Sequence, residues 1–441
     1  MKNVRQVRWL YDELPELTAR GVVDGETAAR LRSHYGEAPQ ASGSRIAVTV
    51  FTILGALLVG AGIILLLAHN WESLSRGMRA VLSFLPLLAA QAIALVIRRR
   101  PAASRGAQEG AALFLALTVA ASIALVGQTY HIYGDLGRFL LAWSLLILPV
   151  IYLFRSTAVF VLYLACVTGW CGFMRAEERE TILYWGLFLA ALPHFILEAR
   201  QARHSIATML GGLGLALAVV VGASIRLDWN WDGLWIVQYS AVFAALYLAG
   251  VYWFGECASG ARKPLRNLGA LGIGVLSFVF TFEDVWRHLD SHHGYHRYAT
   301  EQLYARIGGS LVEITVFLVM AIILGVLLVR RRQFAPLALG AFPILAVAGY
   351  SLAFHDAGLL SAVLFNVYSF GAGVFLLISG VRAGKLGTAN WGLIWMMAIL
   401  VSRFLDLHIS FVAKGVVFIL LGTGFLVTNL ILSKKLRRTM P

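Results

Sequence analysis

Residues 111–150 read AALFLALTVAASIALVGQTYHIYGDLGRFLLAWSLLILPV, and this stretch decides the fold class. Two apolar runs enclose a short link that holds glutamine, tyrosine, histidine and aspartate. The core of a bilayer offers backbone groups no hydrogen-bond partners, so apolar runs of this kind are expected to cross it as helices. The polar link then lies at a membrane surface between two antiparallel spans.

The same alternation runs along the whole chain of 441 residues, of which 59% are hydrophobic and only 14% are charged. Soluble domains carry about 25% charged residues, so this composition excludes a single water-soluble globule. The sequence predicts an all-α, polytopic helical membrane protein with about 14 transmembrane helices. The expected spans are 46–68, 78–97, 107–126, 139–154, 157–174, 182–197, 206–225, 234–254, 267–282, 307–329, 334–354, 358–379, 387–405 and 410–432.

The chain also has polar ends. Residues 1–45 predict a small cytoplasmic helical hairpin and linker, with a first helix that stops at Gly21 and a second that opens on the capping residue Asp24. So small a core is not expected to stand alone, which favours docking on the membrane domain (46–432), a second copy or a cytoplasmic partner. The basic tail, 433–441, is also expected in the cytoplasm. The apolar seam expected between the two helices consists of Trp9, Leu10, Leu14, Leu17, Val22 and Leu31.

The formal net charge of +14 would suggest nucleic acid if it formed one soluble patch. Here the basic residues lie at the ends of apolar runs. The two termini and the six links on the same side hold 26 of the 37 Lys and Arg residues, which is the positive-inside pattern. We therefore expect no nucleic-acid partner, a bacterial inner membrane location and both termini in the cytoplasm.

Small and aromatic residues in the spans favour packing roles. Gly-rich faces such as GAGVFLLISG (371–380) allow helices to approach closely. Trp286 and other tryptophans at span ends are expected to be interfacial anchors. Cys166 and Cys171 are five residues apart, which places them on different helix faces and favours packing over a disulfide or metal site.

Ionisable residues gather on the side expected to face away from the cytoplasm, where eight of the eleven histidines lie. Three interpretations remain open. These links are solvated loops, or they form a site for a small polar or amphiphilic ligand, or they form a metal or acid–base centre.

The link between the two opening runs carries more hydrogen-bonding and ionisable side chains than a solvated loop needs. Gln128, Tyr130, His131 and Asp135 are the candidate ligand-binding residues there. If the preceding helix continues through the link, His131 and Asp135 share a face and the carboxylate would orient the imidazole.

Two further places carry ionisable groups near the membrane, where such groups are costly and usually paired. Arg403 and Asp406 are three residues apart at the outer end of the span 387–405, and they form either an ion pair or part of a site. Glu313 is the deepest carboxylate of the chain, and Arg306 is its expected partner.

No cofactor or metal site is predicted. The link RHLDSHHGYHRY (287–298) has enough histidine and aspartate for zinc but lacks a fixed ligand spacing. Hydrolase, zinc-protease and phosphate-loop motifs do not occur in the sequence.

Three stretches carry a resemblance to a known family: WLYDELPELTARGVVDGETAARLRSHYG (9–36), GALLVGAGIILLLAHNW (55–71) and GQTYHIYGD (127–135). They resemble the predicted prokaryotic membrane proteins of domain-of-unknown-function family 2157. The resemblance implies the same head and multispan layout, and no activity comes with it. The residues that match its motifs are His69, Asn70, Trp71, Gln128, Tyr130, His131 and Asp135.

The leading functional hypothesis is a transporter or lipid-handling protein whose polar site opens on the extracytoplasmic side. Its partners would be membrane lipid and a small-molecule or lipid ligand. The alternatives are a membrane-embedded enzyme for a lipid-linked substrate, with Asp135, Asp406 or Glu313 as base, and a non-catalytic sensor or assembly partner that acts through the head. The sequence also allows a homo-oligomer.

Overall fold

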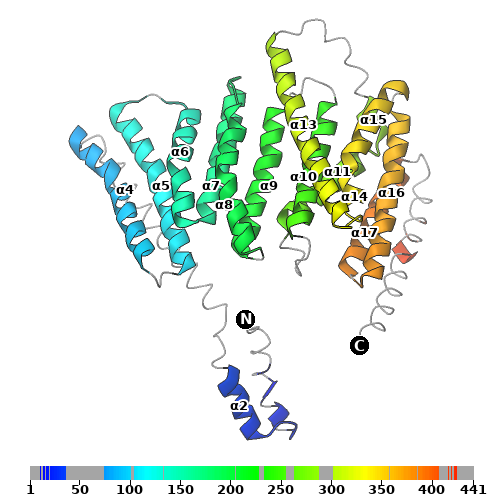
Figure 1. Cartoon of the computed structure of the whole chain (residues 1–441), viewed down its shortest axis with the longest axis horizontal. Helices are drawn as coiled ribbons and strands as arrows, with labels where there is room; N and C mark the ends of the chain where they lie inside the picture. Colours follow the sequence, from blue (N-terminus) through cyan, green and yellow to red (C-terminus); the bar gives the residue numbers. More distant parts are fainter. Residues whose placement is uncertain are drawn as a thin grey trace. The chain divides into compact units, whose positions relative to one another are not determined.

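A computed structural model describes most of the chain, and every regular element in the described part is a helix (Figure 1). Side chains are not described for the helical residues 301–309, 354–356 and 404–406. Two compact units are present, residues 1–81 and residues 82–441. The described residues are 10, 13–14, 16–18, 20–35, 74–100, 104–132, 134–203, 205–227, 233–254, 263–287, 301–356, 358–384, 386–406, 416, 419 and 422–424.

The N-terminal region contains the predicted pair of helical segments. Asp24 caps helix α2 (Gly25–Tyr35), because its carboxylate accepts a hydrogen bond of 3.2 Å from the backbone N–H of Thr27. Gly21 ends the preceding segment in a left-handed conformation with φ 71°. Leu14 is buried as expected, but Val22 is 68% exposed, so its assignment to the seam is wrong. Val22 lies in the turn between the two helical segments, and its side chain points away from their shared face.

Apart from the short α12, the remaining helices overlap the twelve predicted spans between residues 78 and 405. Within the described part of the chain, eight helices are long and apolar enough to cross a membrane: α4, α5, α6, α7, α9, α10, Ser310–Arg330 of α13, and α16. The helices are α4 (Arg76–Arg99), α5 (Arg105–Tyr130), α6 (Leu136–Phe154), α7 (Thr157–Ala176), α8 (Leu183–Gln201), α9 (Ile206–Arg226), α10 (Leu234–Phe254), α11 (Pro264–Val279), α12 (Glu283–Arg287), α13 (Glu301–Arg330), α14 (Leu337–Gly340), α15 (Phe342–Asp356), α16 (Leu359–Arg382) and α17 (Leu386–Asp406).

Several boundaries differ from those expected. The predicted span 334–354 is divided between α14 and α15, because Pro343 lacks the N–H that a continuous helix needs and disfavours a helical residue before it. Helix α11 begins at Pro264, where proline suits the first turn. The predicted first span, 46–68, lies outside the described residues, as does most of the last, 410–432. The count of fourteen spans and the predicted domain boundaries therefore stay predictions.

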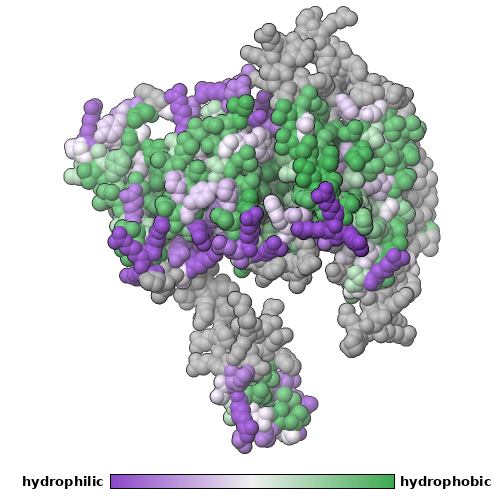
Figure 2. Space-filling view, viewed as in Figure 1, coloured by the Kyte–Doolittle hydropathy of each residue, from purple (hydrophilic) through white to green (hydrophobic). Residues whose placement is uncertain are grey.

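Successive helices alternate in direction, which produces two differently charged ends (Figures 1 and 2). We call the end formed by the links after α4, α6, α8, α10, α13 and α16 the basic end, and the opposite one the mixed-charge end. Between them the helices present the apolar band seen in Figure 2. The basic end carries Arg98, Arg99, Arg100, Arg105, Arg155, Arg200, Arg203, Lys263, Arg266, Arg330, Arg331, Arg332 and Arg382 with Glu109 and Glu198. The mixed-charge end carries Arg76, Arg79, Arg138, Arg175, Arg179, Arg226, Arg287 and Arg403 with Asp135, Glu177, Glu178, Glu180, Glu283 and Asp284.

Helix α10 is the centre of the packing. It contacts α9, α11, α13, α14 and α15, and 72% of its apolar stretch is buried, against 17% for the peripheral α4. One core cluster lies mainly in α4–α10 and α13, and a second joins α10 and α11 to α12, α15 and α16. Trp286 is fully buried in the second cluster, and its indole N–H donates to the Phe280 carbonyl (2.9 Å). Its predicted role as an interfacial anchor is therefore wrong, because α12 directs the ring into the core.

The expected close approach through small residues is confirmed in the 371–380 stretch. A Cβ added to Gly380 would lie 2.4 Å from the backbone nitrogen of Ala389 in α17. Only glycine leaves room for backbones this close. Cys166 and Cys171 are both buried with free thiols.

Candidate functional site

A large groove lies between α4, α5 and α6 and ends in the link between α5 and α6. Its volume is about 1030 Å³, at the upper end of the range of ligand pockets. Most of its lining is apolar, and the polar residues gather near the mixed-charge end. It is lined by Phe84, Leu87 and Gln91 of α4, by Leu115, Val119, Ser122, Ile123, Ala124, Val126, Gly127 and Gln128 of α5, by His131, Ile132, Gly134 and Asp135 of the link, and by Arg138, Phe139, Ala142, Leu146 and Val150 of α6.

Two hydrogen bonds fix the walls relative to one another. The Ser122 hydroxyl donates to the Ser83 carbonyl (2.8 Å), which ties α5 to α4. The Trp143 indole N–H donates to the Ala116 carbonyl (2.8 Å), which ties α6 to α5. Polar groups rarely find other partners inside a bilayer, so these two bonds stabilise the spacing of α4, α5 and α6 around the groove.

The polar rim is shaped by the way in which α5 ends. His131 adopts the left-handed conformation with φ 53°, and the backbone N–H groups of His131 and Ile132 both bond to the Gly127 carbonyl. The helix therefore stops at Tyr130 instead of continuing through the link. The expectation that His131 and Asp135 share one helical face is wrong for this reason.

Asp135 has other partners than His131. Its carboxylate accepts the backbone N–H of Arg138 (2.7 Å), which caps α6, and it pairs with the Arg179 guanidinium (2.8 Å). These contacts hold the pKa of the Asp135 carboxyl below its ordinary value of 3.8, the bond from the Arg138 backbone being the larger cause. The negative charge on the rim is thus fixed and already paired.

The lowered pKa of Asp135 predicts a pH-dependent stability. The contribution is complete above about pH 5 and is lost as the pH falls through 3.8 towards the folded-state pKa, because the unfolded chain then binds the proton more readily. We expect Asp135→Asn to melt below the wild type at neutral pH, with a gap that narrows below about pH 4. Melting temperatures in detergent between pH 3 and pH 7 measure this gap. A gap that is independent of pH would contradict the assignment.

Glu313, the deep carboxylate, lies in a second cluster away from the groove. It forms a buried ion pair with Arg226 of α9 and accepts the Trp185 indole N–H (2.9 Å). The same arginine donates to the Thr181 hydroxyl (2.6 Å). The structure thus gives Glu313 a partner that was not expected, because α9 packs against α13 and brings Arg226 to it. The side chain of the expected partner, Arg306, lies outside the described residues.

Arg403 lies in a third cluster. Its guanidinium donates to the Thr281 hydroxyl (2.6 Å) and lies over the Phe282 ring, 4.4 Å from its centroid. Asp406 belongs to α17, but its side chain lies outside the described residues, as do His69, Asn70 and Trp71.

The structure thus brings only part of the predicted set together. Gln128, His131 and Asp135 line the groove, whereas Tyr130 is 54% exposed and is not part of the lining. Glu313 and Arg403 belong to separate polar clusters and do not join them.

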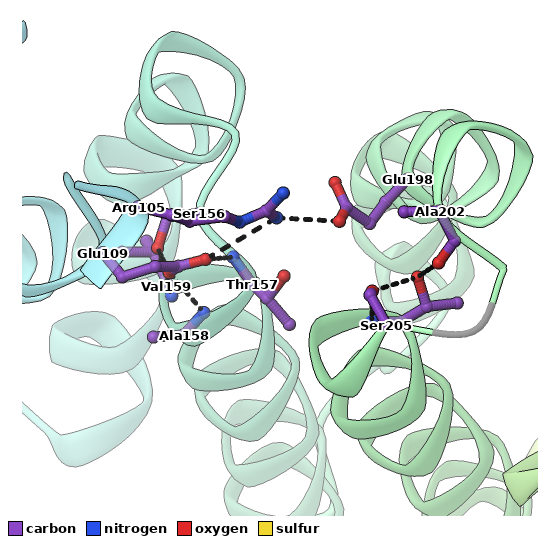
Figure 3. A network of polar contacts seen from close by, with 10 residues as sticks. Arg105, Glu109, Ser156, Thr157, Ala158, Val159, Glu198, Ala202 and Ser205 are labelled. Carbon is purple, nitrogen blue, oxygen red and sulfur yellow. Dashed lines mark hydrogen bonds and ion pairs between the residues drawn. The ribbon is translucent and has the colours of Figure 1, made fainter. Parts of the chain in front are cut away.

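Sequence reasoning missed a polar network at the basic end (Figure 3). The Glu109 carboxylate of α5 accepts the hydroxyl of Ser156 and the backbone N–H groups of Thr157 (3.0 Å) and Ala158 (3.1 Å). A carboxylate from one helix therefore satisfies the free N–H groups at the start of α7.

The same network contains a nearly buried carboxylate. Glu198 is 7% exposed and pairs with Arg105 (2.7 Å) (Figure 3). The available signal was a single acidic residue in the helical turn beside a basic link, at positions 109 and 198. These contacts join α5, α7 and α8 and are structural.

The helices, their apolar band and their charged ends define an all-α polytopic integral membrane protein. Residues 15–160 match the model of the family described as "Predicted membrane protein (DUF2157)". The match confirms the resemblance for this part of the chain, which contains the whole groove lining. Neither the curated proteins nor the solved structures compared with the chain include a match.

Proposed function

We propose that this protein binds a membrane amphiphile, a lipid or a lipid-linked molecule, in the groove, and acts as a transporter or lipid-handling protein. The observation that carries the proposal is the joining of apolar walls to a polar rim in a single groove of about 1030 Å³. An acyl chain matches the walls, and a polar headgroup matches the link between α5 and α6.

The length of the groove supports this occupant. Its lining extends along α6 from Phe139 to Val150, and the eleven steps between these two residues rise by about 16 Å. That is about half of the 30 Å hydrocarbon core. A lipid tail can therefore lie beside α6 while its headgroup stays at the membrane surface.

The charges on the rim favour an anionic headgroup. Asp135 is neutralised by Arg179, whereas the Arg138 side chain is 74% exposed and lies 3.9 Å from the Asp135 carboxylate. A guanidinium in this position can bind a phosphate or carboxylate through two hydrogen bonds. Gln128 and His131 add neutral hydrogen-bonding groups.

The same contacts give the enzyme alternative less support. A general base needs a carboxylate that is free to accept a proton from the substrate. Asp135, the carboxylate of the rim, is held by Arg179 and by the backbone N–H of Arg138. These contacts favour a binding role for the rim.

The location is also proposed. The excess of arginine at the basic end supports a cytoplasmic position of that end in a bacterial inner membrane. The groove then opens on the extracytoplasmic side.

A photoreactive phosphatidylglycerol, reconstituted with the full-length protein in lipid nanodiscs, tests the proposal. We expect label on α5 and α6, and at least about tenfold less label in Ala142→Trp, because an indole at this position of the lining obstructs the path of an acyl chain along α6. Leu145→Trp is the matched control, since Leu145 lies on the same helix, is 50% exposed and is not part of the lining. Melting temperatures check that both variants fold.

Two results would overturn the proposal. One is equal labelling of the two tryptophan variants. The other is a high-yield disulfide between cysteines placed at Ala56 and Ala142, which would identify the chain's own segment 46–68 as the occupant of the groove.

A further inference from the structure

A second pocket lies at the basic end, between the last turns of α8 and α10 and the residue that follows α13. Its volume is about 280 Å³, too small for a whole lipid but sufficient for a headgroup. Three arginines, Arg200, Arg203 and Arg331, line it together with Tyr252 and Trp253. It belongs to the opposite end of the helices from the groove.

The charge of this pocket is unbalanced among the residues that line it. Among the residues that the structure describes, none that lines the pocket is acidic. The nearest carboxylate along α8 is Glu198, and it is engaged by Arg105 at 2.7 Å. Three cations in one pocket without a lining carboxylate favour an anionic occupant.

Arg331 is held in place by aromatic packing. Its guanidinium lies over the Tyr252 ring at 4.0 Å from the centroid, and its Nη1 donates to the Tyr252 carbonyl (3.4 Å). The stacked side chain is thereby ordered before any ligand binds, which lowers the entropic cost of binding.

Helix ends offer a competing explanation for the arginines. α8, α10 and α13 all end here, and each C-terminus carries about half a negative charge. Together the three ends amount to about 1.5 negative charges against three full positive charges. The helix ends therefore do not neutralise the pocket, and a net positive charge remains for a ligand.

We infer that this pocket binds a phosphate group of a net anionic ligand. Arginine pairs with phosphate through two parallel hydrogen bonds, and basic pockets between membrane helices bind anionic headgroups. Trp253 is 41% exposed at the helix end, the level at which aromatic side chains meet lipid headgroups. The phosphate comes from a membrane lipid or from a soluble phosphate compound.

The inference is independent of the groove. The two sites share no lining residue and lie at opposite ends of the helices. If phosphatidylglycerol does not label the groove, the inference about the basic pocket still stands. If the basic pocket does not bind phosphate, the proposal about the groove still stands.

The test measures binding by native mass spectrometry after extraction in detergent. The full-length Ala142→Trp protein is the background for every variant, so that phosphatidylglycerol bound in the groove does not mask binding in the basic pocket. The probes are phosphatidylglycerol, phosphatidylcholine and inorganic phosphate, added separately. The test variant is Arg200→Gln/Arg203→Gln/Arg331→Gln. The matched control, Arg99→Gln/Arg100→Gln/Arg332→Gln, removes the same charge from the same end but changes no lining residue. Melting temperatures show that both proteins are folded.

We expect the test variant to bind phosphatidylglycerol at least about tenfold more weakly than the control does. If the pocket binds phosphatidylglycerol but does not bind inorganic phosphate, its ligand is a lipid headgroup. If it binds inorganic phosphate and the test variant loses this binding, its ligand is a soluble anion. Equal losses in the two variants, or a preference for phosphatidylcholine, would overturn the inference. Arg331→Lys keeps the charge but loses the stacked, forked geometry, so an intermediate loss is expected.

Discussion

Replacing Glu313 by methionine is expected to lower the free energy of unfolding by about 3–5 kcal/mol. The substitution leaves the Arg226 guanidinium, which is 12% exposed, without its carboxylate. A charge buried in a membrane protein cannot recover its hydration, so the cost falls on the folded state. Reversible unfolding in mixed micelles measures the change.

Removing both members of the pair separates charge from packing. We expect Glu313→Met/Arg226→Met to recover most of the loss, since an apolar pair of similar volume is often as stable as a buried ion pair. The matched control is Glu283→Gln, which breaks the pair with Arg287 on α12, whose side chains are 33% and 56% exposed. That change is expected to cost less than about 1 kcal/mol. A double variant as unstable as the single one would contradict the assignment of the loss to the unpaired charge.

Substitution of Gly269 by alanine is expected to lower stability by about 3 kcal/mol, the upper part of the range for overpacked cores. A Cβ at this position of α11 would lie 2.4 Å from the backbone nitrogen of Tyr247 in α10. Gly250 makes the reciprocal approach, with its added Cβ 2.2 Å from the backbone nitrogen of Arg266. Backbone atoms cannot rotate away as a side chain does, so the two helices must separate.

Gly110 provides the matched control for this prediction. It also lies within a helix, α5, but an added Cβ has no neighbour within 4 Å. Gly110→Ala is expected to leave stability unchanged or raise it by up to about 1 kcal/mol, because alanine favours the helix. Thermal melting in one detergent compares the variants. Equal melting temperatures for Gly269→Ala and Gly110→Ala would show that the crossing of α10 and α11 tolerates a wider separation.

The amino-acid sequence by itself determined where the helices lie. Apolar runs of membrane length, many of them ended by basic residues, located the long helices between α4 and α17 and their alternating directions, but not the short α12. This succeeds because the bilayer leaves backbone groups no partner outside the helix, so hydropathy alone selects the structure. Local signals also set ends correctly, as at Asp24 and Gly21. The break at Pro343 was readable from the sequence but was not predicted.

The site was only partly predictable. The sequence singled out Gln128, His131 and Asp135, and the structure places all three on the rim of one groove. The sequence could not identify the apolar residues that form the walls of this groove, because they do not differ from the lipid-facing residues of other spans. The sequence also could not show which aromatic residues form the core, since Trp286 resembled an interfacial residue but is buried.

Tertiary structure alone decided the partners of the ionisable groups. Glu313 pairs with a residue 87 positions away, and Asp135 pairs with one 44 positions away. Spacing along one helix suggested Arg306 and His131 instead, since sequence reasoning recognises only neighbours one turn apart. Which helices pack together depends on small residues and on shape at each crossing, and these are properties of the assembled helices. Hydropathy gave the positions of the long helices in the sequence, and the packing of the assembled helices determined their neighbours.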